Sequence, residues 1–221
     1  CLPGSRAKVV SWLSDVNSEF GFSDDTLHLG VKLMDSFMAS PEGRTSDTSK
    51  LQLVGVTAWL LAAKVEGVRP VRLVRACCSA TNNTYSAGEV MAMERDIAVA
   101  LDWRLTPPLA TSFLSCYAQA LAIDEDTVAK AIHLMKMCLP SDTMQGVMAS
   151  RLAAASLFLA LGSGASGQDL SRLEGLCRVS EGELVELVER LEAVCKEEPG
   201  PQPTSSRRAA PKASSPGSSK K

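Results

Sequence analysis

A run of eleven residues, Leu53 to Ala63, most constrains how this chain can fold. It is apolar except at Gly55 and Thr57, and it ends against Lys64. A helix that is apolar on all sides has no face left for water, so it must lie at the centre of a bundle. The run is too short to cross a bilayer, which takes roughly 20 apolar residues. The sequence therefore predicts a buried central helix that ends in a charged residue.

The rest of the chain also favours helices. Hydrophobic residues make up 45% of the 221 residues, but only 5 are Phe and 2 are Tyr. Few segments alternate between apolar and polar residues, as strands would. We therefore expect an all-α protein, and the length fits one or two domains at roughly 100 to 200 residues each.

Apolar residues recur at helical spacing in two similar series of five helices. The first series is predicted over residues 6–20, 24–40, 49–65, 71–79 and 87–101, with a polar connection over residues 41–48. The second is predicted over residues 109–121, 125–139, 144–161 and 169–177, followed by a last helix that Ser180 caps. Ser23 is predicted to cap the second helix. Ser86 with Glu89 and Ser180 with Glu183 have the spacing of capping boxes.

These series predict two tandem five-helix bundles, over residues 1–105 and 106–198, and a tail over residues 199–221. The tail has no large apolar residue and no acidic residue, so we expect it to be disordered. Its basic pairs, Arg207-Arg208 and Lys220-Lys221, leave two interpretations open, a two-part nuclear import signal or a solubilising tail. The body up to Glu198 holds 18 basic and 25 acidic residues, a net charge of −7 that disfavours nucleic-acid binding.

Sequence patterns of catalysis or metal binding are absent. The seven cysteines have no C-x-x-C spacing, so we expect reduced core thiols and no metal site. Only His28 and His133 are candidate bases, in separate helices, and His28 is interpreted as a surface residue of its helix's first turn. We therefore expect no enzyme activity and no cofactor. We also expect no membrane partner, because the sequence shows no signal peptide or membrane span.

Four charged residues fall on apolar helix faces. Unpaired buried charges are costly, so Arg6 and Asp35 are predicted to form an internal ion pair. For Lys64 and Glu94 two alternatives remain open, an internal pair or a site left free for another protein.

Several short motifs in the first bundle resemble the cyclin box of A- and B-type cell-cycle cyclins. They include Arg6-Ala7 with Trp12-Leu13, residues 25–29, 50–56 and 60–66, and Met93-Glu94, in the family's order. The positions that mark the family's box are met by Arg6, Asp35, Leu53, Lys64 and Glu94. A three-residue insertion lies between Asp35 and Leu53, and the second bundle resembles the family's divergent C-terminal fold by pattern only.

The resemblance implies the regulatory, activating subunit of a cyclin-dependent serine/threonine kinase, acting in mitotic cell-cycle control in nucleus and cytoplasm. In that family the Lys and Glu that match Lys64 and Glu94 hydrogen-bond to the kinase around its regulatory helix. The helix moves inward, so that its Glu pairs with the ATP-positioning Lys. The pocket for an aliphatic kinase side chain would comprise Leu61, Val65, Ala98, Trp103 and Leu105. The alternative is a cyclin-fold transcription or scaffold protein that activates no kinase.

The resemblance also implies a groove that recruits kinase substrates carrying a basic-then-leucine motif. Val9, Trp12, Asp15 and Gln52 match groove positions, and Asp15 is placed to meet the motif's Arg. Ser5 and Lys8 stand where larger apolar side chains are usual. Because Lys8 repels a basic motif and apolar contact is lost, we expect docking there to be weak or absent.

Overall fold

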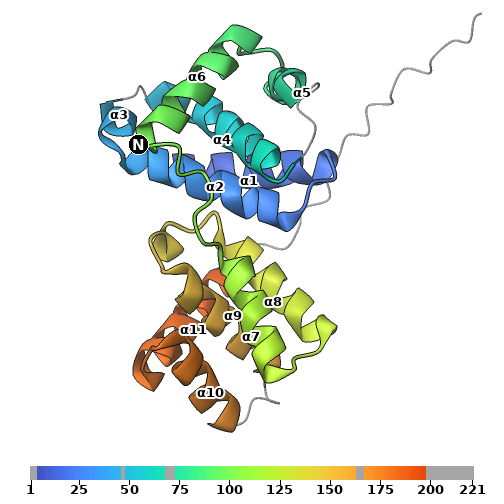
Figure 1. Cartoon of the computed structure of the whole chain (residues 1–221), viewed down its shortest axis with the longest axis vertical. Helices are drawn as coiled ribbons and strands as arrows, with labels where there is room; N and C mark the ends of the chain where they lie inside the picture. Colours follow the sequence, from blue (N-terminus) through green and yellow to red (C-terminus); the bar gives the residue numbers. More distant parts are fainter. Residues whose placement is uncertain (1–3, 46–47, 68–72, 163–166, 198–221) are drawn as a thin grey trace, which may run out of the picture.

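The computed structural model describes residues 4–45, 48–67, 73–162 and 167–197. Every regular element in these ranges is a helix, so the predicted all-α fold is confirmed. The helices form two bundles that follow one another along the long axis of the molecule (Figure 1). The predicted tail lies outside the described residues, and the division at residue 105 stays a prediction.

The N-terminal bundle is built around helix α4 (Leu51–Val65), which packs against all four of the other long helices of this bundle. These are α1 (Ser5–Glu19), α2 (Asp24–Ala39), α5 (Leu73–Ala80) and α6 (Ala87–Ala100). Every residue of α4 from Leu53 to Ala63 is buried, as its apolar run predicts. A 3-10 turn, η1 (Thr48–Lys50), precedes α4.

Trp59 ties the centre of this bundle to the turn between α1 and α2. Its indole Nε1 donates to Asn17 Oδ1 at 3.0 Å, and Asn17 Nδ2 donates to the carbonyls of Phe22 and Ser23 at 3.1 Å each. The Phe22 ring stacks on the indole, with centroids 5.1 Å apart. These buried polar groups are therefore satisfied, which fixes α4 against the α1–α2 turn.

The C-terminal bundle repeats the plan around α9 (Ala149–Leu161), whose residues Ala153 to Leu157 are all buried. Around it pack α7 (Ala110–Leu121), α8 (Glu125–Cys138), α10 (Gly167–Cys177) and α11 (Glu181–Glu197). A 3-10 turn, η3 (Asp142–Met144), follows α8. Two tandem bundles with buried central helices agree with the sequence prediction.

Both predicted capping boxes form. Ser86 Oγ accepts from Glu89 N at 3.3 Å, while the Glu89 carboxylate accepts from Ser86 N at 2.9 Å. Ser180 and Glu183 repeat this exchange at 3.4 and 3.2 Å. Hydrogen bonds from the capping serines lower the pKa of both glutamates, and the bond from the serine backbone N–H has the largest effect.

Two element predictions are wrong. The polar connection after α2 was predicted without a helix, but it contains the short helix α3 (Pro41–Thr45), which Ser40 caps by accepting from Gly43 N at 3.1 Å. Helix α9 begins at Ala149 and not at Met144, because Gly146 has φ of +81° in the left-handed region, where a right-handed helix cannot continue.

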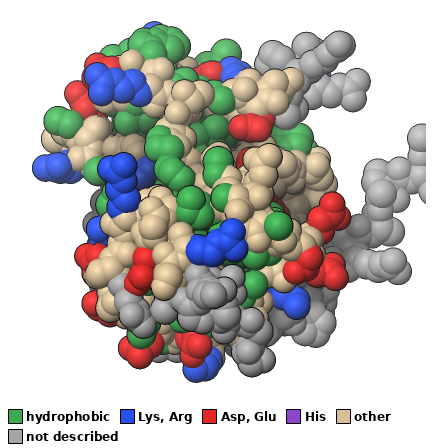
Figure 2. Space-filling model, turned by 60° about the horizontal axis from the view of Figure 1, so that its bottom comes forward, with side chains coloured by type: hydrophobic (Ala, Val, Ile, Leu, Met, Phe, Trp, Pro, Cys, Tyr) green, Lys and Arg blue, Asp and Glu red, His purple; other side chains and the backbone are tan. Residues whose placement is uncertain are grey.

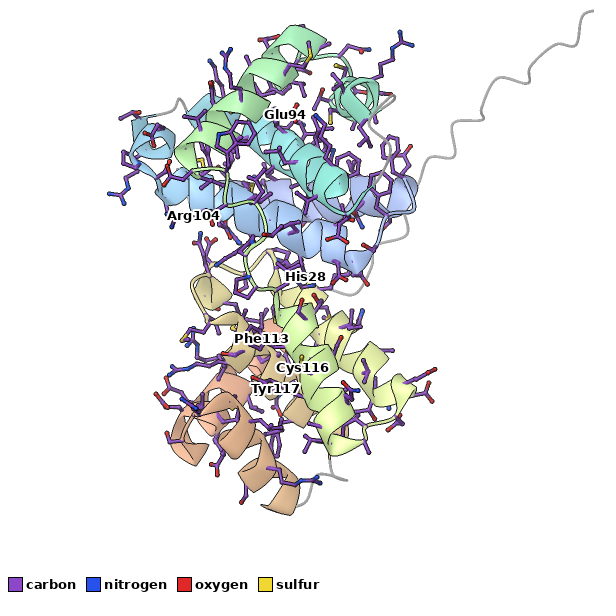
Figure 3. The ribbon with its side chains drawn as sticks, in the orientation of Figure 1. His28, Glu94, Arg104, Phe113, Cys116 and Tyr117 are labelled. Atoms are coloured by element: carbon purple, nitrogen blue, oxygen red, sulfur yellow. The ribbon has the colours of Figure 1, made fainter. Side chains whose placement is uncertain are left out.

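The predicted surface position of His28 is also wrong. His28 is buried in α2, because α2 packs on α4 with one side and on α8 of the other bundle with another. The prediction of core thiols holds for Cys77 and Cys138, which are buried, but not for Cys116, which is exposed on α7 (Figure 3). Burial raises the pKa of the Cys77 thiol to about 12.

None of the described helices is long and apolar enough to span a membrane. On the face drawn in Figure 2, basic and acidic side chains both occur among apolar ones. The expected lack of nucleic-acid binding stays a prediction.

Candidate partner-binding site

Lys64 and Glu94 meet between the last turn of α4 and the middle of α6. Lys64 Nζ donates to Glu94 Oε1, so the two side chains form an ion pair across the packed helices. The side chains remain 31% and 20% exposed. The internal pair therefore forms, and because both side chains stay partly exposed, contact with another protein remains a prediction.

The apolar residues predicted for the kinase pocket lie on α4, on α6 and in the segment that follows α6. Leu61 on α4 and Ala98 on α6 are buried, and Leu105 is half-buried. Val65 and Trp103 are large apolar residues left exposed, Trp103 to 69%. A buried floor beside an exposed rim, next to a charged pair, is the usual composition of a protein contact surface. The positions predicted for a kinase pocket thus differ in exposure, and their grouping into one pocket stays a prediction.

Two backbone hydrogen bonds hold Trp103 in a strained conformation. Asp102 N donates to Val99 O at 3.0 Å and Trp103 N donates to Ala98 O at 2.8 Å, which closes the C-terminus of α6 as a Schellman motif. Asp102 and Trp103 have φ of +50° and +58°, in the left-handed region that is unfavourable for a bulky residue. Such strain is concentrated at functional sites, and here it presents an indole to solvent.

Arg6 and Asp35, the predicted internal pair, contact each other through two hydrogen bonds. Arg6 Nε and Nη2 donate to the two Asp35 oxygens at 2.7 Å each. Arg6 Nη1 also donates to the carbonyls of Leu139 and Pro140, at 2.9 and 3.3 Å. Gln145 Nε2 donates to Asp35 Oδ1 at 3.4 Å. Sequence reasoning missed these contacts, through which the pair also joins the N-terminal bundle to the end of α8.

A second ion pair joins the two bundles. Lys136 Nζ on α8 lies 2.8 Å from Asp24 Oδ1 at the start of α2. His28 lies between Asp24 and Asp35 along α2 and lines a cavity of about 100 Å³, which Arg6 and Asp35 also line. Burial lowers the pKa of His28 to about 4, outweighing the opposite effect of Asp24 and Asp25. The imidazole is therefore neutral at pH 7.

The residues predicted to line a substrate groove lie on α1 and at the start of α4. Val9 and Trp12 are half-buried against the N-terminal core, as is Gln52 at its helix start, while Asp15 is exposed. Of the two unusual residues, Ser5 is half-buried and Lys8 is exposed. Lys8 thus stands at the surface where a basic peptide would approach, and weak docking stays the prediction.

Metal-binding geometry is absent from the described part of the chain, where no three His, Cys, Asp or Glu side chains are grouped to hold an ion. This observation does not test the expectation that the protein binds no cofactor.

Comparison with known proteins decides the family. Residues 2–106 match the family described as "Cyclin, N-terminal domain", and residues 108–218 match "Cyclin, C-terminal domain". The chain belongs to the cyclin family. The two matched ranges correspond to the N-terminal and C-terminal bundles of this cyclin.

Several relatives are A- and B-type cyclins. G2/mitotic-specific cyclin-B2 of Rana japonica is 37% identical over 166 residues, which cover 73% of this chain and 41% of that protein. G2/mitotic-specific cyclin-B of Arbacia punctulata is 33% identical, with 71% and 37% covered. Cyclin-A2-1 of Arabidopsis thaliana is 33% identical, with 72% and 36% covered. The chain thus spans less than half the length of these relatives.

Solved structures support the fold of this cyclin. A viral cyclin from herpesvirus saimiri superposes with a TM-score of 0.75 at 20% identity, covering 87% of this chain and 84% of that chain. A chain of the CAK complex from Chaetomium thermophilum bound to ATP-gamma-S gives 0.58 at 15% identity, with 87% and 64% covered.

Proposed function

We propose that this cyclin is the activating regulatory subunit of a cyclin-dependent serine/threonine protein kinase and acts in mitotic cell-cycle control. The catalytic residues belong to the kinase partner, and the cyclin itself performs no chemistry. The observation that carries the proposal is the partly exposed Lys64–Glu94 pair across α4 and α6, together with the exposed indole of Trp103 after the end of α6. The names of its mitotic relatives support the cell-cycle assignment.

Each part of this surface has a distinct role in the proposed complex. Lys64 and Glu94 exchange hydrogen bonds with backbone or side-chain groups around the kinase's regulatory helix. Leu61 and Ala98 form the floor for an aliphatic kinase side chain, with Trp103 and Leu105 along its rim. Val65 and Ala98 are smaller than the family's usual residues, so the pocket is wider, which favours a bulkier kinase side chain. Docking moves the helix inward and completes the ATP site of the kinase.

The proposal extends to location and further partners. We place the complex in the nucleus and cytoplasm, with kinase substrates as transient partners. Because the docking groove carries Lys8, substrate choice then falls to the kinase or to another surface.

Binding of purified kinase catalytic subunits to site variants tests the interface. Lys64→Ala and Glu94→Ala should each weaken binding by about 2 kcal/mol, roughly 30-fold, because truncation strands desolvated groups on the kinase. The loss of folding stability should stay near 1 kcal/mol, since the pair is partly exposed.

Glu192→Ala is the matched control, because it removes a Lys–Glu pair on α11, in the other bundle. It should leave kinase affinity unchanged. A large stability loss in the Lys64 and Glu94 variants with unchanged affinity would contradict the interface. Binding without any gain in kinase activity would favour a scaffold protein of this fold.

A further inference from the structure

The segment that joins the two bundles is anchored at alternate residues. It has no helical structure from residue 104 to 109 and runs between α6 and α7 in Figure 1. The half-buried positions are Leu105, Pro107 and Leu109. The exposed positions are Arg104, Thr106 and Pro108, which alternate with them. Leu105 and Leu109 pack against the N-terminal core. This period of two is that of extended backbone, so Thr106 faces outward between two half-buried neighbours.

Thr106 precedes a proline, which is the minimal sequence that a proline-directed serine/threonine kinase accepts. Pro107 also biases the backbone of Thr106 away from the helical region and toward an extended one. The Thr106 hydroxyl forms no hydrogen bond with any residue that the structure describes. A kinase must bring the acceptor oxygen in line with the γ-phosphoryl group, and an exposed hydroxyl on extended backbone permits this.

A second residue that precedes a proline, Ser40, can be compared with Thr106. Within the described ranges, the other serine or threonine that precedes a proline is Ser40. Its hydroxyl is engaged twice, because Ser40 Oγ donates to Phe37 O at 2.7 Å and accepts from Gly43 N at 3.1 Å. Ser40 is half-buried where α2 meets α3, so its hydroxyl is not available for transfer.

We propose that Thr106 is a phosphorylation site for a proline-directed serine/threonine kinase that uses Mg²⁺ and ATP. Thr106 Oγ1 forms a bond to the γ-phosphorus, the bond from that phosphorus to the bridging oxygen of ADP breaks, and ADP leaves. The hydroxyl proton passes to the carboxylate of the kinase's catalytic loop. The product carries a charge of about −1.5 to −2 between Leu105 and Pro107.

The phosphate would lie beside the kinase-binding surface. Trp103 and Leu105 precede it closely in sequence, and a charge there would have to be desolvated when a kinase docks. Arg104 is exposed, and its guanidinium lies 4.0 Å from the exposed Asp102 carboxylate, so it can turn to pair with the phosphate. Phosphorylation therefore weakens kinase binding, a consequence that rests on the proposed function, whereas the acceptor site does not.

The acceptor site is tested with a purified proline-directed kinase that is active without a cyclin. The full chain carrying Ser215→Ala, which removes the Ser-Pro pair of the tail, is incubated with ATP and mapped by peptide mass spectrometry. We expect one phosphate on Thr106, none on Ser40, and loss of the signal in Thr106→Val. Pro107→Ala should slow incorporation at least tenfold. Preferred modification of Ser40 would overturn the assignment. The assignment would also be overturned if the kinase phosphorylated a synthetic peptide of residues 101–112 but left Thr106 unmodified in the full chain.

The regulatory consequence is measured separately, by titrating phosphorylated and unmodified protein against the kinase subunit that the unmodified chain binds. Phosphorylation should lower affinity at least tenfold, and Thr106→Val treated in the same way should retain full affinity. Equal affinities would refute the regulation. If no kinase binds even the unmodified chain, the proposed function fails, while the mass spectrum still decides the phosphorylation site.

Discussion

Replacing Arg6 by Met tests whether its contacts hold the two bundles together. Met keeps most of the aliphatic stem but removes two hydrogen bonds to Asp35 and two to the carbonyls of Leu139 and Pro140. Losing one partner of a buried ion pair costs about 3–5 kcal/mol, against about 0–1 for an exposed pair. The two side chains are 13% and 21% exposed, nearer the buried limit, so we expect a loss of about 3 kcal/mol.

Urea unfolding followed by two probes measures this loss. All three tryptophans, Trp12, Trp59 and Trp103, lie in the N-terminal bundle or at its end, so fluorescence reports on that bundle alone. Far-UV circular dichroism reports on both bundles. We expect the two transitions to coincide in the parent and to separate in Arg6→Met, because the shared contacts are lost.

Two further variants complete the test. Lys136→Met removes the more exposed inter-bundle link to Asp24, so it should cost about 0–1 kcal/mol. Asp35→Leu added to Arg6→Met should recover part of the loss, since it removes the stranded carboxylate. The reasoning is refuted if Arg6→Met stays within about 0.5 kcal/mol of the parent.

Two other predictions follow from the buried histidine and from the groove. The folded-state pKa of His28, about 4, lies below its ordinary value of 6.5, so the stability from keeping it neutral is present above pH 6.5 and lost as pH falls toward 4. Between pH 7 and pH 4 the parent should lose about 3 kcal/mol more than His28→Gln in chemical denaturation; equal losses would contradict the burial argument. A labelled basic-then-leucine peptide should bind weakly in fluorescence anisotropy, and Ser5→Met with Lys8→Ile should strengthen it. Tight binding by the parent, abolished by Trp12→Ala, would contradict the second prediction.

Local rules predicted most of the fold. The apolar run from Leu53 to Ala63 required a central helix, because burial on all sides leaves no other place for it. The boxes at Ser86 and Ser180 depend only on residues three apart, so their positions were predictable to the residue. The family motifs around Lys64 and Glu94 likewise named two residues that meet across α4 and α6.

What the sequence did not predict depends on how the bundles meet. His28 was expected at the surface as a residue of its helix's first turn, yet α8 of the other bundle packs against α2. The contacts of Arg6 with Leu139 and Pro140 join residues more than 130 positions apart, which no local spacing encodes. The late start of α9, by contrast, was predictable from Gly146. A glycine readily takes the positive φ that a right-handed helix cannot include, so the helix begins after it.

Stimulation of kinase activity tests the central claim most directly. Purified catalytic subunits of cyclin-dependent kinases are assayed for phosphate transfer to a peptide, with and without the full chain. We predict that the chain raises the activity of at least one subunit by 100-fold or more, about 2.7 kcal/mol in transition-state terms, and that Lys64→Ala with Glu94→Ala abolishes most of the gain. Equal stimulation by the double variant, or tight binding of a kinase with no stimulation, would contradict the account.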